Sequence, residues 1–60
     1  MVATIEHPER ASLADVRSLS RRAQGEGVRS MAYAALLEVA YAARSEAVRR
    51  AAWRGLEGVK

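Results

Sequence analysis

The chain has 60 residues, half of them hydrophobic, with no cysteine and a formal net charge of +3. The lack of cysteine excludes disulfides and thiolate metal sites, and a chain this short makes one domain that buries only ~60% of its unfolded surface. Alanine supplies 13 of the hydrophobic residues and phenylalanine is absent. We therefore expect an almost wholly α-helical chain whose meagre core needs a partner subunit.

Residues 1–7 are β-prone but have neither the length nor the turn signals of an independent strand. We expect this segment to be a flexible arm. Residues 1–12 lack the basic start and the apolar stretch of a signal peptide, so we expect the protein to stay in the cytoplasm.

A first helix is predicted over residues 9–23. Pro8 and Glu9 suit the first turn of a helix, and Ser12 followed by Asp15 would form a capping box that starts the helix later. Apolar residues then recur every three or four positions on one face, at Leu13, Val16, Leu19 and Ala23. Two glycines close behind this pattern, Gly25 and Gly27, predict the end of the helix and a reversal of the chain.

Residues 31–43 are the most apolar stretch, and Glu38 is their only charged side chain. The stretch is well short of the ~20 residues that span a bilayer. We predict a long helix over residues 28–54, because no glycine or proline interrupts it, and it begins near Val28 or with Ser30 as its N-cap. The alternative is a break near 44–45, where Ser45 would cap a separate helix. Glu38 should reach solvent at the rim or pair with an arginine.

Two apolar stripes separate on a helical wheel of the predicted long helix. The bulky stripe contains Leu37, Tyr41, Val48, Ala52, Leu56 and Val59, and the alanine stripe contains Ala40, Ala43, Ala47 and Ala51. A first helix of ~16 residues cannot cover both stripes of a helix of ~26 residues. We therefore predict an all-α helical hairpin that self-associates through the alanine stripe, most simply as a dimeric four-helix bundle.

Side chains that could carry catalysis are few. The chain has one histidine and one aspartate, and Gly25 and Gly27 lack the strand and the lysine of a phosphate-binding loop. Glu6, His7 and Glu9 are adjacent in a segment expected to be flexible, which is not a recognisable metal site. We predict no enzymatic activity, no catalytic or metal-ligating residue and no cofactor.

The whole positive excess lies in residues 44–60. Predicted partner-binding residues here share one polar arc: Arg49, Arg50, Trp53 and Arg54. An exposed tryptophan among arginines is typical of a surface that binds a protein, a nucleic acid or a membrane interface. Alternatively, the cations complement the helix dipole and Trp53 packs against a dimer partner.

The order of segments resembles that of the ribbon–helix–helix repressors and antitoxins. The segment Thr4-Ile5-Glu6-His7-Pro8 precedes the first helix, and Gly25-Glu26-Gly27-Val28-Arg29-Ser30 separates it from the second. The resemblance covers about two thirds of the chain and implies a dimer whose paired strands enter the major groove of DNA. Thr4 and Glu6 would face the DNA, where that family commonly has basic or amide residues.

Together these observations predict a small self-associating helical binding or regulatory protein that acts through protein–protein interaction with an unidentified partner. A dimeric DNA-binding regulator is the first alternative, and a peripheral membrane-binding helix is the second. A steep decline of binding with salt would favour nucleic acid.

Overall fold

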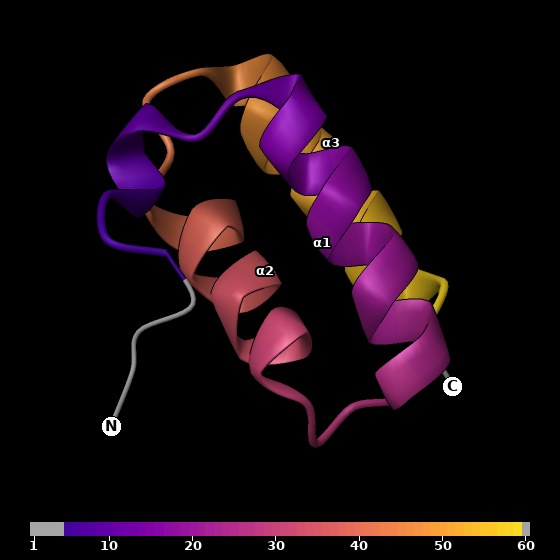
Figure 1. Cartoon of the computed structure of the whole chain (residues 1–60). Helices are drawn as coiled ribbons and strands as arrows, with labels where there is room; N and C mark the ends of the chain where they lie inside the picture. Colours follow the sequence, from indigo (N-terminus) through magenta and orange to yellow (C-terminus); the bar gives the residue numbers. More distant parts are fainter. Residues whose placement is uncertain (1–4, 60) are drawn as a thin grey trace.

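The structure is a computed structural model that describes residues 5–59. It contains a short 3-10 turn, η1 (Pro8–Arg10), and the helices α1 (Leu13–Glu26), α2 (Met31–Ala42) and α3 (Glu46–Glu57). The chain runs along α1, returns along α2 and then runs along α3 in the same direction as α1 (Figure 1). The predicted all-α class is confirmed, but the described residues form three helices where the sequence predicted a two-helix hairpin.

The first helix begins later than residue 9. The hydroxyl oxygen of Ser12 accepts a hydrogen bond from the backbone N–H of Asp15 at 3.2 Å, and the Asp15 carboxylate accepts one from the N–H of Ser12 at 2.9 Å. This capping box starts α1, so the start near residue 9 is wrong and the alternative at Ser12 is confirmed. Pro8 opens η1 instead.

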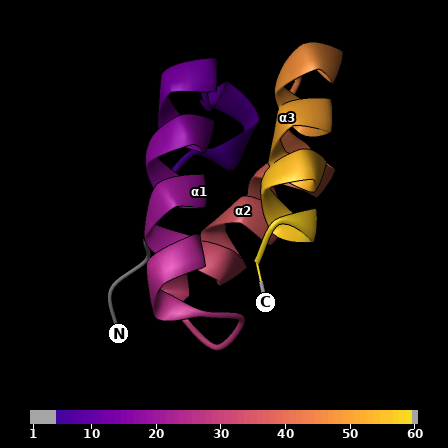
Figure 2. The same cartoon turned by 90° about the vertical axis from the view of Figure 1, so that its right-hand side faces the viewer.

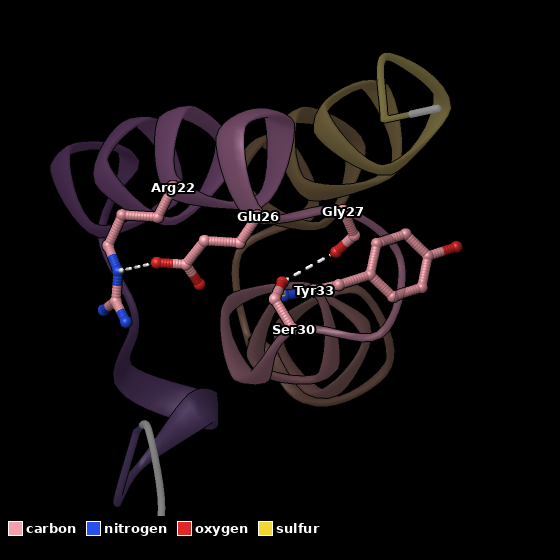
Figure 3. Close-up of polar contacts among 5 residues, drawn as sticks. All are labelled: Arg22, Glu26, Gly27, Ser30 and Tyr33. Atoms are coloured by element: carbon pink, nitrogen blue, oxygen red, sulfur yellow. Dashed lines mark hydrogen bonds and ion pairs between the residues drawn. The ribbon is translucent and has the colours of Figure 1, made fainter.

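The first helix also ends later than residue 23. It ends at Glu26, where Gly27 takes a left-handed φ of 95° and donates its N–H to the carbonyl of Ala23. Ser30 then holds the turn into α2 (Figure 3): its hydroxyl donates to the carbonyl of Gly27 at 2.8 Å and accepts from the N–H of Tyr33 at 3.1 Å. The second helix therefore begins at Met31 with Ser30 as its N-cap, so the start near Val28 is wrong and the alternative at Ser30 is confirmed.

The continuous helix predicted over residues 28–54 is wrong, and the alternative of a break near 44–45 is confirmed, because the chain leaves the helical path between α2 and α3. Ser45 accepts a hydrogen bond from the N–H of Val48 at 3.4 Å and caps α3. Arg49 reaches back across the break, where its guanidinium donates to the carbonyls of Ala43 at 2.7 Å and Arg44 at 3.1 Å. Carbonyls at the end of a helix lack partners within that helix, and Arg49 supplies them here.

The core lies between the three helices and consists mostly of small side chains. The buried residues are Ala11, Val16, Leu19, Ala23, Ala32, Ala35, Leu36, Val39, Ala40, Ala43, Val48, Ala52 and Leu56. The two largest that are completely covered, Leu36 and Val39, both belong to α2. The three helices pack against one another, and the apolar α2 supplies the most completely covered side chains, as its sequence requires.

The alanine stripe is divided by the break between α2 and α3. Ala40 and Ala43 are buried within the chain itself, Ala51 is half-buried and Ala47 is exposed. A second subunit is predicted to cover one long helix that α1 leaves partly bare, but here α3 folds back and covers α2 from within the same chain. The dimer stays a prediction, and Ala40 and Ala43 are not on the surface through which it was expected to form.

The predicted arm is partly ordered. Its residues 1–4 lie outside the described residues, whereas Ile5 packs against the core. The backbone carbonyl of Glu9 accepts a hydrogen bond from the N–H of Arg44 at 3.2 Å, so η1 is tied to the connection between α2 and α3. Residues 5–7 form no strand, and the ribbon implied by the resemblance is not seen in this part of the chain.

Candidate binding groove between α1 and α3

A groove of about 660 Å³ lies between α1 and α3. Figure 2 shows these helices side by side and running in the same direction. Residues of both helices line the groove. They are Leu13, Val16, Arg17, Ser20, Arg21 and Gln24 on α1, and Ala47, Arg50, Ala51 and Arg54 on α3. We refer to these ten residues as the α1/α3 groove. A second hollow, of about 200 Å³, lies near Ile5 and Leu19.

Four arginines line the α1/α3 groove, two from each helix. Arg17 and Arg21 are four residues apart on α1, and Arg50 and Arg54 are four residues apart on α3, so each pair projects from one face of its helix. The two members of a pair are separated by ~6 Å along the helix axis. All four side chains are exposed, and none of the residues that line the groove carries a carboxylate.

One of these arginines has an acidic neighbour on its own helix. The Arg50 guanidinium lies 2.6 Å from the Glu46 carboxylate, and both side chains are largely exposed. Exposed ion pairs spaced in this way stabilise a helix by only ~0.3–0.5 kcal/mol, because water and salt screen them. Arg50 can therefore exchange this partner for another anion at little cost.

The base of the α1/α3 groove is apolar. Val16 is buried, Ala51 is half-buried, and Leu13 remains 47% exposed at one end. Ala47 and Ala51 are small, so the α3 wall leaves space above them. Leu13 thus adds exposed apolar surface to the base of a cationic groove.

Close packing of α1 against α3 sets the base of the groove. Gly55 faces Ser20, and a Cβ atom on Gly55 would lie 3.2 Å from the Ser20 Cβ and still closer to its hydroxyl oxygen. Only glycine permits this approach without displacement of Ser20. The spacing of the two arginine-bearing helices thus depends on a residue with no side chain.

Of the four partner-binding residues predicted from the sequence, two line the α1/α3 groove. Arg50 and Arg54 do so, whereas Arg49 is half-buried and holds the break between α2 and α3. Trp53 lies elsewhere on α3, 40% exposed, with its ring edge-to-face against Tyr41 at a centroid distance of 5.3 Å. The single arc predicted from the sequence is therefore divided between structural and groove-lining roles.

Other polar side chains of the described residues have simpler roles. Glu38 is exposed, which confirms its predicted position at the rim. The His7 ring lies 3.3 Å from the Glu9 carboxylate, and a hydrogen bond from the backbone N–H of Glu9 holds the pKa of that carboxyl below its ordinary value. Residues 5–59 contain no group of three or more histidine, aspartate or glutamate side chains that could hold a metal ion.

No helix of the described residues is both long enough and apolar enough to cross a membrane. In comparisons with known proteins, no family model, no curated protein and no solved structure matches the chain.

Proposed function

We propose that this protein is a small helical binding protein that acts through protein–protein interaction, with the α1/α3 groove as its contact surface. The observation that carries the proposal is the convergence of four arginines and an apolar base in one concavity. Arginine is enriched at the energetic centres of protein interfaces, because it combines an apolar stem with five hydrogen-bond donors.

A regulator that binds DNA is the second candidate, since arginines also bind phosphates. The shape of the surface favours a protein partner. DNA-reading helices protrude so that one helix enters the major groove, whereas these four cations line a hollow between two helices. A phosphate backbone would also leave Leu13, at the edge of the hollow, without an apolar partner.

Site-specific photo-crosslinking in lysate of the source cells tests the proposal. A crosslinking amino acid at Ala47, which is exposed in the groove, should capture a discrete protein, and capture should survive nuclease treatment. The same amino acid at Ala42, which is exposed outside the groove, is the matched control. Equal capture from both positions, or capture that nuclease abolishes, would contradict the proposal.

A further inference from the structure

Resting on the proposed function, we infer what occupies the α1/α3 groove: an acidic amphipathic α-helix of the partner protein. It lies along the valley between α1 and α3 and adds a fourth helix to the bundle. Three features of the groove specify this occupant: the sign and placement of its charges, its apolar base and its length.

Charge selects an acidic partner. The groove carries arginines on both walls and no carboxylate in its lining, so a partner with carboxylates along both flanks pairs with each wall. A second copy of this chain is a poor occupant, because symmetric pairing of two such grooves would bring arginines against arginines. Arginine also binds a carboxylate through two parallel hydrogen bonds, which fixes the orientation of the partner side chain.

The apolar base selects a helix over an extended acidic tail. An extended tail would satisfy the arginines and leave Leu13 and Ala47 exposed to water. A helix presents large apolar residues at i, i+3 or i+4, and i+7, which form one continuous stripe. The volume of about 660 Å³ above Ala47 and Ala51 accommodates that stripe, while positions on either side of it point toward the two arginine pairs.

The length of the groove sets the length of the occupant. The lining on α1 extends from Leu13 to Gln24, which at 1.5 Å per residue is ~17 Å. A partner segment of about three helical turns spans this distance. The two walls run side by side in the same direction (Figure 2), and each carries two arginines, so a helix that lies between them meets cations on both flanks.

Fluorescence anisotropy with a synthetic helical probe tests the inference. The probe is a labelled, helix-stapled peptide of about four turns, with leucines at i, i+3, i+4 and i+7 and glutamates on both flanks. The control peptide has the same composition and staple, with leucines and glutamates permuted so that no apolar stripe forms. We expect the amphipathic probe to bind at least about tenfold more tightly than the permuted peptide.

Matched protein variants locate the binding. Arg17→Gln and Arg54→Gln remove one cation from each wall, and each should weaken probe binding by about threefold to tenfold. Arg29→Gln removes an exposed arginine that does not line the groove and should leave binding unchanged. Leu13→Ala should lower the affinity of the protein for the amphipathic probe and leave its affinity for the permuted peptide unchanged. Thermal melts of every variant establish that it is folded.

Several outcomes would overturn the inference. Equal affinity of the two peptides would mean that charge alone is recognised, and tighter binding of a short DNA duplex, lost in the same arginine variants, would assign the groove to nucleic acid. Failure of the probe to bind, while Ala47 still captures a protein in lysate, would reject the acidic helix and leave the proposed function standing. Absence of both signals would reject both.

Discussion

The guanidinium of Arg49 lies 2.7 Å from the backbone carbonyl oxygen of Ala43, six residues earlier in the chain. This hydrogen bond joins α3 to the end of α2 at the point where the helical path is interrupted. We expect Arg49→Met to destabilise the fold by about 1–3 kcal/mol, because a charged donor is lost and a part-buried carbonyl is left without it. Urea denaturation followed by circular dichroism measures this loss.

Arg50→Met is the matched control for that measurement. Arg50 is the next residue on α3 and makes an exposed ion pair with Glu46, so its replacement should cost less than about 0.5 kcal/mol. Similar losses at both positions would show that Arg49 contributes only as one more surface charge.

The core prediction compares two leucines of opposite exposure. Leu36 is completely buried, so Leu36→Ala should cost about 2–5 kcal/mol through lost apolar contact and the cavity left behind. Leu13 is 47% exposed at the groove, and Leu13→Ala should cost less than about 1 kcal/mol. Chemical denaturation of both variants gives their free energies of unfolding. A large loss of stability in Leu13→Ala would mean that Leu13 supports the fold and is not available to bind a partner.

The edge-to-face contact between Tyr41 and Trp53 predicts an interaction energy that a double-mutant cycle can isolate. We expect a coupling of about 0.5–1.5 kcal/mol between Tyr41→Ala and Trp53→Ala. Because Trp53 is 40% exposed, its single replacement should cost less than the ~3–5 kcal/mol of a buried aromatic residue. Additive losses would mean that the two rings do not pack together in solution.

Two glycines inside helices should respond to alanine in opposite directions. Nothing lies near the position of a Cβ on Gly25, so Gly25→Ala should stabilise α1 by up to about 1 kcal/mol through helix propensity. At Gly55 the same change forces Ser20 to move, and we expect a net loss that makes the two variants differ by about 1–3 kcal/mol. Thermal melts of both proteins give the difference.

A compensating variant identifies the cause of the loss at Gly55. Ser20→Gly removes the atoms that the new Cβ would meet, so Gly55→Ala should be tolerated better in that background than in the native chain. If Gly55→Ala is equally harmful in both backgrounds, contact between α1 and α3 is not the reason.

Local signals in the sequence specified most of the helical segments. The apolar spacing of Val16, Leu19 and Ala23 places α1 correctly, and the serines that cap α1, α2 and α3 are all visible as candidate starts. The prediction of a continuous helix across Ser45 is wrong. Helix propensity favours continuity there, but the break is stabilised by packing of α3 on α2 and by Arg49, and neither contact is visible in a local pattern.

The α1/α3 groove depends on contacts between distant segments, which explains why only half of its cationic wall was predicted. The accumulation of positive charge in residues 44–60 predicts Arg50 and Arg54 as binding residues. Arg17 and Arg21 carried a signal too, since they lie four residues apart on the polar face of an amphipathic helix. Only the return of α3 alongside α1 shows that the two pairs face one concavity.

Alanine supplies more than half of the buried hydrophobic residues found in the described part of the chain. Unfolding should therefore hydrate little apolar surface, and the heat-capacity change should fall below the ~12–15 cal/mol/K per residue of ordinary globular proteins. In so small a domain each 1 kcal/mol of stabilisation shifts the melting temperature by about 4–8 °C. A ligand at 100 times its dissociation constant contributes about 2.7 kcal/mol of stability. Binding of the correct occupant should therefore raise the melting temperature by about 10 °C or more, a shift that calorimetry measures easily.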